Sequence, residues 1–349
     1  MLKVLMIGPD RSVHGGISGV VNNYYKAGLD KKVDLQYIGT MVEGSKLRKL
    51  VQAALAYVRF LFALPGVAIV HVNVASDASY VRKSFFIRTA HLFSKKIVIH
   101  QHGGDFQTFY EKERNDRQRA GIRKVFGMGD AFLVLAPFWK EFFGTIIDKN
   151  RITVLPDAIQ IPAVQEKEES GNKVLFLGRL CKEKGIGELL ACVPGIVEKI
   201  PDFHLYLGGI WEDSGLQKQA EQDREHVTWL GWLGEEEKSR WLSECQVLVL
   251  PSYFEGQSVA ILEAMAYRCG IVASDTGGIP QMIKDGETGI LVRPKDVDSL
   301  QCGLLRILGD KALCRELGEK ARAKAIQDFS MEQNMEKLLG IYREITGVS

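Results

Sequence analysis

Long uninterrupted hydrophobic runs are missing from this 349-residue sequence. A membrane-spanning helix needs about 20 consecutive apolar residues. The longest apolar stretch, residues 51–70, is interrupted by Arg59 and broken by Pro65, so it predicts a core helix followed by a strand and no transmembrane segment. The first apolar run ends at Gly8 and Pro9, which indicates a buried first strand rather than a signal peptide.

Cysteine patterns that would indicate a disulfide framework or a zinc site are missing too. The six cysteines all lie in the second half of the chain, and none belongs to a Cys-x-x-Cys pair. The seven histidines do not cluster with them at the spacing of zinc ligands. Because there is no secretory signal either, we expect free thiols in a reducing compartment. This predicts a cytoplasmic location, which includes the inner face of the plasma membrane.

The net charge of +2 conceals an uneven distribution. Residues 1–165 contain 23 Lys and Arg against 13 Asp and Glu, a net of +10, and the remainder contains 22 against 30, a net of −8. This asymmetry indicates that the first half faces something anionic, such as a membrane surface or a phosphorylated acceptor. Basic segments interleaved with apolar residues occur at 46–50, 81–96 and 114–124, although solvated helix faces would account for the same pattern.

Strand-like apolar runs alternate with helix-length segments along the chain, which is typical of parallel sheets with helical crossovers. A polar stretch near residues 163–172 indicates a linker. We therefore predict an α/β protein of two Rossmann-like, doubly wound domains, residues 1–165 and 166–330, that face each other across a cleft. The chain from Val297 to Thr346 is predicted to be helical, and residues 331–349 to pack back toward the first domain.

The most informative stretch is residues 251–266, PSYFEGQSVAILEAMA. It reads as the end of an apolar strand, a Glu-Gly turn, and a helix that carries a second glutamate. Such a turn aims backbone N–H groups and the positive end of a helix at one point, which suits an anionic ligand. Glu255 and Glu263, with seven residues between them, would flank the anion with acceptors for hydroxyl groups. This fits a molecule that is part phosphate and part sugar.

A second cluster, GRLCKEKG at residues 178–185, directly follows a predicted strand. Arg179 and Lys184 would lie on a loop at the carboxyl end of that strand, where two cations can neutralise a pyrophosphate leaving group. Surface Lys and Arg are common, so the position after a strand is what favours this interpretation.

Two glycine-containing loops follow strands in the first half. Gly15 and Gly16 precede a helix and serve either a tight turn or the close approach of the backbone to a diphosphate. His102 precedes a glycine loop at a strand end and is predicted to hydrogen-bond a sugar hydroxyl or to stabilise a developing charge. His100, two residues earlier, is predicted to point to the opposite face and to be structural.

These motifs together resemble those of the family 4 glycosyltransferases, retaining enzymes of the GT-B fold. The matching segments are GGISGVV, QHGGD, GRLCKEKG, EGQSVAILEAMA and the run from 270 to 296, so the resemblance spans residues 15–296. Two glutamates separated by seven residues are the main signature of the family. The resemblance implies that residues 1–165 bind the acceptor and that residues 166–330 bind a nucleotide sugar.

The resemblance also implies a role for each matching residue. Arg179 and Lys184 would hold the donor diphosphate, and Glu263 would accept hydrogen bonds from the ribose hydroxyls. Glu255 would contact hydroxyls of the transferred sugar, and His102 would lie beside the sugar ring. The residues taken as catalytic are therefore Arg179, Lys184, His102 and Glu255. Further donor-binding positions are Gly15, Gly16, Trp232, Gly256, Gln257, Ser258 and Val259.

The chain contains one Asp-x-Asp sequence, Asp296-Val297-Asp298. This sequence bears on metal use, because the other large glycosyltransferase fold coordinates its donor through such a pair. Here the two acids open a helical region, which predicts a helix N-cap followed by a first-turn acid. With Arg179 and Lys184 offsetting the diphosphate charge, no metal cofactor is expected.

The expected reaction is a retaining transfer to an acceptor hydroxyl by front-face substitution, in which the leaving phosphate accepts the proton. The resemblance implies a UDP- or GDP-sugar donor and a glycan or lipid-pyrophosphate-linked acceptor of bacterial surface polysaccharide assembly. Peripheral contact with an anionic membrane is expected, and no nucleic acid. A sugar-nucleotide epimerase of the same fold and a non-catalytic sugar-nucleotide-binding protein remain as alternatives.

Overall fold

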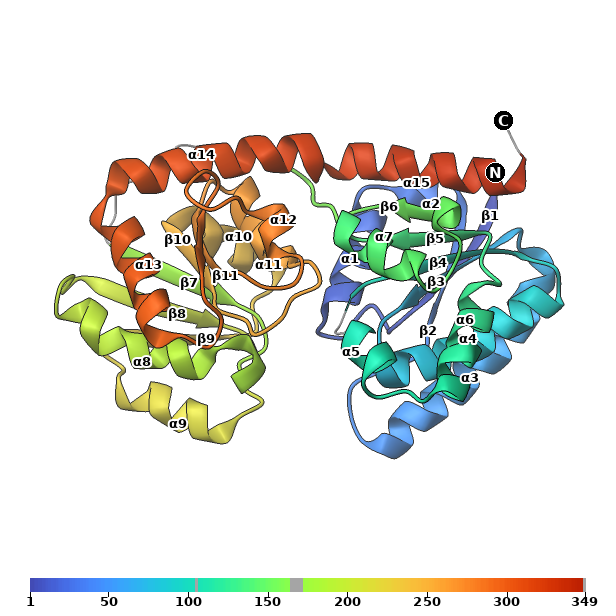
Figure 1. Cartoon of the computed structure of the whole chain (residues 1–349), viewed down its shortest axis with the longest axis horizontal. Coiled ribbons are helices and arrows are strands. Elements are labelled where there is room, and N and C mark those ends of the chain that lie inside the picture. Colours follow the sequence, from blue (N-terminus) through green and yellow to red (C-terminus); the bar gives the residue numbers. More distant parts are fainter. Residues whose placement is uncertain (104–105, 164–171, 348–349) are drawn as a thin grey trace. The chain divides into compact units, whose positions relative to one another are not determined.

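The chain forms two compact units in the computed structural model (Figure 1). The first unit contains residues 1–160 and 331–349, and the second contains residues 161–330. The structure describes residues 1–103, 106–163 and 172–347. The boundary predicted between residues 165 and 166 lies outside the described residues. No helix in the described ranges is long and apolar enough to cross a membrane.

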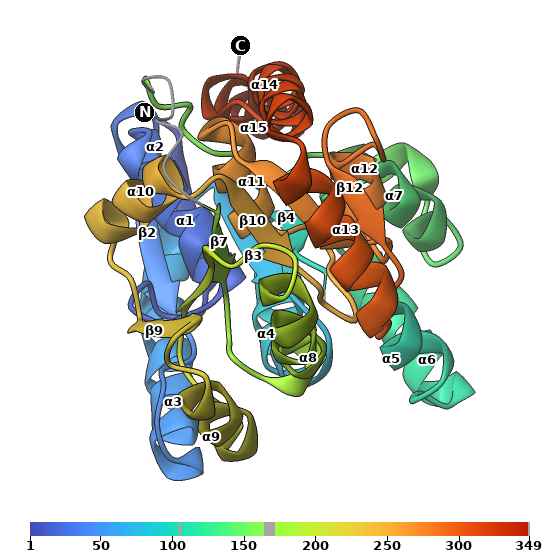
Figure 2. The same cartoon turned by 90° about the vertical axis from the view of Figure 1, so that its left-hand side faces the viewer.

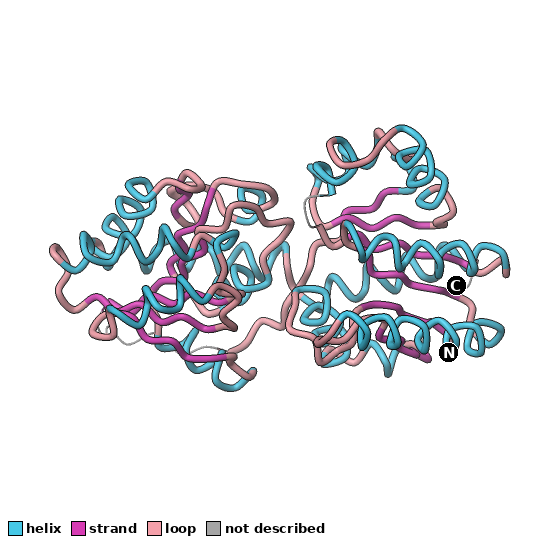
Figure 3. The backbone as a smooth tube through the Cα atoms, turned by 90° about the horizontal axis from the view of Figure 1, so that it is seen from below, coloured by secondary structure: helices cyan, strands magenta, loops and turns pink. Residues whose placement is uncertain are grey.

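The first unit is built around a six-stranded parallel sheet with the strand order β2-β1-β3-β4-β5-β6, flanked by helices (Figure 3). The central strands are continuous apolar runs because both faces of the sheet are covered. The strands are β1 (Lys3–Gly8), β2 (Asp34–Gly39), β3 (Ile69–Val74), β4 (Lys96–Gln101), β5 (Ala131–Val134) and β6 (Ile152–Val154). The helices are α1 (Gly16–Lys26), α2 (Leu29–Lys32), α3 (Lys46–Ala63), α4 (Asp77–Leu92), α5 (Phe106–Glu111), α6 (Asp116–Phe126), α7 (Pro137–Gly144) and α15 (Met331–Thr346).

The second unit has the same architecture, with the strand order β12-β11-β10-β7-β8-β9 and all described pairs parallel. Helix α8 packs beside α13, as Figures 1 and 2 show. The strands are β7 (Asn172–Leu177), β8 (Phe203–Gly208), β9 (Val227–Gly231), β10 (Val247–Leu250), β11 (Gly270–Ser274) and β12 (Ile290–Val292). The helices are α8 (Ile186–Val197), α9 (Ser214–Gln222), α10 (Glu235–Glu244), α11 (Val259–Ala266), α12 (Ile279–Met282), α13 (Val297–Gly309) and α14 (Lys311–Asp328). The predicted α/β fold of parallel sheets is confirmed.

Three successive helices, α13, α14 and α15, cover residues 297–346, so the predicted helical region without a further strand is confirmed. Helix α15 belongs to the first unit, where its polar side chains bond to the core. The hydroxyl of Tyr24 donates to Asn334 Oδ1 at 2.7 Å, and Tyr342 Oη lies 2.6 Å from His71 Nδ1. All six cysteines lie in the described ranges, and none of them forms a disulfide there.

The prediction of a core helix within residues 51–70 is wrong. The helix there is α3, and only Ala56 and Phe60 along its length are fully buried. Its apolar residues occur on two opposite sides, and only one side packs against the neighbouring helix α4. Hydrophobicity alone does not distinguish a buried face from an apolar face that points to solvent.

Candidate functional site

The topology of the second sheet places two loops next to each other. Strands β7 and β10 are neighbours, yet the chain leaves β7 toward β8 and β9 and leaves β10 toward β11 and β12. This is the switch point at which ligands bind in doubly wound sheets, beyond the carboxyl ends of the strands. The loops that follow β7 and β10 carry Arg179, Lys184 and Glu255.

The loop after β7 is drawn against the end of β10 by a glycine. It forms a short 3-10 turn, Lys182–Lys184, and then enters α8 through Gly185, whose φ is +72°. A Cβ atom at Gly185 would collide with the carbonyl oxygen of Pro251. A larger residue would therefore have to push the two loops apart, and Gly185 allows Lys184 to reach the residues that follow β10.

Lys184 and Glu255 form an ion pair across the two loops. The ammonium of Lys184 donates to Glu255 Oε1, and the hydroxyl of Ser252 donates to the same oxygen at 2.8 Å. The side chains of Lys184 and Glu255 are 19% and 13% exposed. The pair thus combines a cation, a carboxylate and a hydroxyl in a place that is screened from solvent but still reachable.

The loop after β11 packs on the Glu-Gly turn that follows β10. The N–H of Gly278 donates to the carbonyl oxygen of Glu255 at 2.8 Å. Cβ atoms at Gly277 and Gly278 would collide with the carbonyl oxygens of Glu255 and Gly256. The two glycines therefore permit backbone-to-backbone contact with Glu255 and Gly256. This contact supports the turn and restricts the position of the Glu255 side chain.

The turn leads into the start of α11. Ser258 is the N-cap of this helix, and its hydroxyl accepts from the N–H of Ile261 at 3.4 Å. The first-turn N–H groups of a helix have no partner within it, and the cap satisfies one of them. The backbone at Gly256, Gln257, Ser258 and Val259 thus lies at the positive end of a helix, beside Lys184 and Glu255.

Glu263 lies one turn further along α11 and is paired with a residue that the sequence analysis did not single out. The ammonium of Lys238, on α10, donates to Glu263 Oε1. Both side chains are partly buried. A Lys on a neighbouring helix carries no local sequence signal, because only the packing of α10 beside α11 brings it to the glutamate.

Arg179 and Trp232 are more exposed. Arg179 Nη1 lies 2.9 Å from Glu212 Oε2, and both of these side chains are largely in solvent. Trp232 follows β9 at the edge of the sheet and is 50% exposed. All four predicted cation or acid positions, Arg179, Lys184, Glu255 and Glu263, thus have partners of opposite charge in the ligand-free protein. A bound anion would have to compete with or divide these pairs.

In the first unit, Gly15 and Gly16 open helix α1. Both are exposed, Gly15 is in an extended conformation, and no side chain caps the helix. Nothing lies within 4 Å of a Cβ built at either position. The start of this 11-residue helix therefore presents uncapped N–H groups to solvent, an arrangement that can accept an anion.

The prediction that His100 and His102 point to opposite faces is wrong. Their ring centroids lie 4.0 Å apart, because side chains two positions apart on an extended chain project to the same side. The imidazole of His102 is almost fully buried. Asn73 Nδ2 donates to the carbonyl oxygen of Ile7, so Asn73 Oδ1 accepts from His102 Nε2–H at 2.7 Å.

This hydrogen bond directs the other nitrogen of His102 toward a buried acid, Asp157. His102 Nδ1 lies 3.4 Å from Asp157 Oδ1. Burial and the nearby Lys83 ammonium lower the pKa of His102 to about 3, and burial raises the pKa of Asp157 to about 7. Between about pH 3 and pH 7 the pair therefore holds one titratable proton, which resides on the acid rather than on the imidazole.

The donor atoms of His100, His102 and Asp157 lie within 4.8 Å of one another, a geometry compatible with a metal ion. Lys83 in its charged form opposes this reading, because its positive charge acts on His102, while burial lowers the pKa of Lys83 itself well below its usual value. Lys83 itself donates to Thr40 Oγ1 at 2.8 Å. Asp296, the other acid examined for metal binding, caps α13 by accepting from the N–H of Ser299 at 2.8 Å, which confirms the N-cap prediction.

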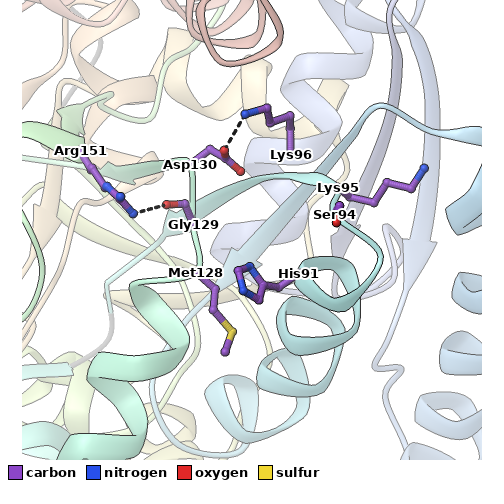
Figure 4. Close-up of a pocket in the computed structure, with 8 residues that line it drawn as sticks. All are labelled: His91, Ser94, Lys95, Lys96, Met128, Gly129, Asp130 and Arg151. Atoms are coloured by element: carbon purple, nitrogen blue, oxygen red, sulfur yellow. Dashed lines mark hydrogen bonds and ion pairs between the residues drawn. The ribbon is translucent and has the colours of Figure 1, made fainter.

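A pocket elsewhere in the first unit lies at the opposite edge of the sheet from His102, where strands β4, β5 and β6 begin (Figure 4). Its charged groups already bond to the protein. Lys96 pairs with Asp130 at 3.0 Å, and Arg151 donates to the carbonyl oxygen of Gly129 at 3.3 Å. This pocket therefore does not share the features of the switch point.

Residues 157–324 match the family model described as glycosyl transferases group 1. Among curated proteins, the chain is similar to alpha-maltose-1-phosphate synthase of Mycolicibacterium smegmatis. The two are 33% identical over 188 residues, which cover 50% of this chain and 48% of that protein. The chain spans about half the length of the curated relatives it matches.

Solved structures are similar over the whole chain. Sucrose-phosphate synthase from Thermosynechococcus elongatus superposes with a TM-score of 0.82 at 20% identity and covers 100% of both chains. Anabaena Alr3699/HepE in complex with UDP-glucose superposes with a TM-score of 0.75 at 14% identity, covering 99% of this chain and 100% of that one. Likeness at these identities shows the fold, and the predicted GT-B fold is confirmed.

Proposed function

Because residues 157–324 match the model of the glycosyl transferases group 1 family, we propose that the chain belongs to this family and moves a sugar from a nucleoside-diphosphate sugar to an acceptor hydroxyl with retention of configuration. The observation that carries the proposal is the cluster of Lys184, Glu255 and Ser252 at the switch point of the second sheet, beside the start of α11. A cation and a helix N-terminus suit a diphosphate, and a carboxylate beside them suits sugar hydroxyls.

The donor is assigned to the second unit. Arg179 and Lys184 bind the diphosphate, with backbone N–H groups from Gly256 to Val259 at its distal phosphate. Glu255 accepts from hydroxyls of the transferred sugar, and Glu263 accepts from the ribose. Trp232 lies near the base. The first unit, with its excess of basic residues, binds the acceptor. His102 and the start of α1 are the proposed ligand-contacting positions of that unit.

The ion pair between Lys184 and Glu255 determines which polar contacts a bound donor has to replace. In the ligand-free protein the carboxylate and the ammonium satisfy each other. A donor offers phosphate oxygens to Lys184 and hydroxyl groups to Glu255, so both partners exchange one polar contact for another and neither is left buried and unpaired. A ligand with only one of these two groups leaves the other partner unsatisfied, which favours an intact nucleotide sugar.

The transfer itself breaks the bond between the anomeric carbon and the phosphate oxygen and forms a bond from that carbon to the acceptor oxygen. The acceptor proton goes to the leaving phosphate. Arg179, Lys184 and the helix terminus stabilise the phosphate as its negative charge develops, and this supplies the main reduction of the barrier. None of these steps uses Glu255 as a nucleophile, because its carboxylate is engaged by the sugar hydroxyls.

The donor is proposed to be a UDP- or GDP-sugar, since HepE, with the same fold, is seen with UDP-glucose. For the acceptor we propose a glycan or a lipid-pyrophosphate-linked sugar of bacterial surface polysaccharide assembly. Support for an anionic acceptor comes from the net charge of +10 in residues 1–165, which attracts a phosphorylated substrate. The protein is expected to work in the cytoplasm, without nucleic acid.

A donor screen tests the proposal. A panel of UDP- and GDP-sugars is examined by thermal shift, because a bound donor raises the unfolding midpoint by mass action, and then by nucleotide release with and without acceptor glycans. The anomeric configuration of the product is read by NMR. Formation of an epimer from the donor alone would identify an epimerase, and binding without turnover would identify a sensor; either result would overturn the transferase assignment.

Lys184→Ala is the sharpest variant for this test. We expect turnover to fall by about 10²-fold or more, as for the loss of a preorganised donor to developing charge. Lys182→Ala is the matched control, because Lys182 is an exposed cation in the same 3-10 turn. Equal turnover in the two variants would reject the assigned role of Lys184.

A further inference from the structure

Helix α3 exposes a broad apolar side to solvent. Seven of its large hydrophobic side chains are exposed. The two most exposed, Phe62 and Leu47, are 84% and 70% exposed. Successive residues of a helix are rotated by about 100°, and at this spacing the seven occupy one continuous side that covers less than half of the circumference. They are Leu47, Leu50, Val51, Leu55, Val58, Leu61 and Phe62.

The opposite side of α3 holds the helix to the protein. Ala56 and Phe60 are buried, Phe60 packs edge-on against Phe86 of α4, and Tyr57 Oη lies 2.7 Å from Thr89 Oγ1. Figure 1 shows α3 beside α4 in the first unit. A surface helix normally has a polar outer side. In α3 the outer side is apolar as well, and its side chains are not buried within the protein.

The charges on α3 are all of one sign. Its charged residues are Lys46, Arg48, Lys49 and Arg59, and it has no acidic residue. All four are exposed, and Lys49 lies near enough to Glu43 to be one of the groups that lower the pKa of that carboxyl. At helical spacing Arg48 and Arg59 lie along one border of the apolar side, while Lys46 lies toward the other.

The other two basic segments of the first unit differ from α3, because several of their cations already have partners. In the segment 81–96, Lys83 is buried and bonded to Thr40, and Lys96 is paired with Asp130. In the segment 114–124, Arg119 and Arg123 donate to the backbone and hydroxyl oxygens of Tyr110. Arg88, Arg117 and Lys124 of these segments are exposed as well, so α3 is distinguished by combining exposed cations with an exposed apolar side.

We propose that α3 docks on an anionic lipid bilayer. The apolar side enters the boundary between headgroups and acyl chains, and Lys46, Arg48 and Arg59 along its borders lie at the level of the lipid phosphates, the arrangement of an interfacial amphipathic helix. A second copy of the chain fits this surface less well, because an interface of α3 with itself would bring two sets of four positive charges together without an acidic partner. The proposal does not depend on the sugar transfer.

Vesicle co-flotation with the full-length chain tests this docking. We expect binding to phosphatidylglycerol/phosphatidylcholine vesicles, release by high salt, and little binding to phosphatidylcholine alone. Arg48→Gln/Arg59→Gln removes two charges along one border and should weaken binding about 30-fold, at roughly fivefold per charge. Leu47→Gln/Phe62→Gln should weaken it at least about tenfold by removing apolar contact.

Ile326→Gln is the matched control, because Ile326 is an exposed apolar residue on α14 and should leave vesicle binding unchanged. The substituted residues of α3 are exposed, so unchanged thermal midpoints and donor binding are expected in all variants. The docking is refuted if the wild-type protein does not bind anionic vesicles, or if the α3 variants bind as well as the wild type. A concentration-dependent dimer that the α3 variants abolish, without vesicle binding, would instead assign this face to a second copy.

Discussion

His102 and Asp157 form a buried pair, and replacing one or the other should change the pH dependence of folding stability in opposite directions. Burial raises the pKa of Asp157 from 3.8 to about 7, and burial with the Lys83 charge lowers the pKa of His102 from 6.5 to about 3. Neither shift has the partner as its main cause, so each should survive when the other residue is replaced. Between about pH 4 and 6.5 the folded pair holds one proton on the acid, and the unfolded chain holds one on the imidazole.

Equal proton numbers in the two states mean that the intact pair contributes almost no pH dependence to folding in this range. In Asp157→Asn only the histidine titrates, and the unfolded state binds the extra proton. The free energy of unfolding should then rise by about 1.4 kcal/mol per pH unit, or about 2 kcal/mol from pH 4.5 to 6.0, relative to the wild type. In His102→Gln the folded state binds the extra proton on Asp157, so the free energy should fall by a similar amount.

Hydrogen exchange of the amides in β3 and β4 measures this effect, because these strands lie in the core of the first unit and carry neighbours of the pair. Protection is compared with intrinsic rates at each pH, and the wild type supplies the dependence common to all other groups. Parallel pH profiles for the wild type and both variants would refute the reasoning. Slopes of the same sign in the two variants would do so as well.

Three further outcomes test other parts of the site. Glu255→Gln frees Lys184 from its carboxylate, so calorimetry should show the nucleoside diphosphate binding about fivefold more tightly while turnover falls; weaker binding would contradict the proposed exchange of partners. Glu263→Ala should raise the KM for the donor about tenfold with little change in kcat, through the lost ribose hydrogen bonds, and a change confined to kcat would argue against that contact. Asp296→Ala should lower the thermal midpoint by a few degrees through loss of the α13 cap and leave turnover insensitive to EDTA, whereas rescue of lost turnover by Mn²⁺ would assign this acid to a metal.

Much of the fold could be predicted because the central strands are continuous apolar runs separated by helix-length segments, and both covered faces of a parallel sheet demand that pattern. The N-cap at Asp296 and the helical region after it could also be predicted, since capping acts between residues only three positions apart. The prediction that α3 is a core helix failed because local information was not sufficient. The apolar residues of α3 occupy two sides of the helix, and no local rule states which side meets the core.

The candidate site shows the same division between local and distant information. The sequence placed Lys184 and Glu255 on loops after strands, which is local information. They are 71 residues apart in the chain and pair because β10 lies next to β7. Likewise Lys238 reaches Glu263, and Asp157 reaches His102, only through packing of distant segments.

The sequence by itself determined the class of fold, the strand-end position of the charged loops and the resemblance to a glycosyltransferase family, because each depends on residues close together in the chain. The tertiary structure alone decided which charges neutralise each other in the ligand-free state, that His100 and His102 share a buried face, and that α3 leaves an apolar side in solvent. These depend on which elements become neighbours and on how much water each side chain loses, and both are properties of the packed chain rather than of any segment of it.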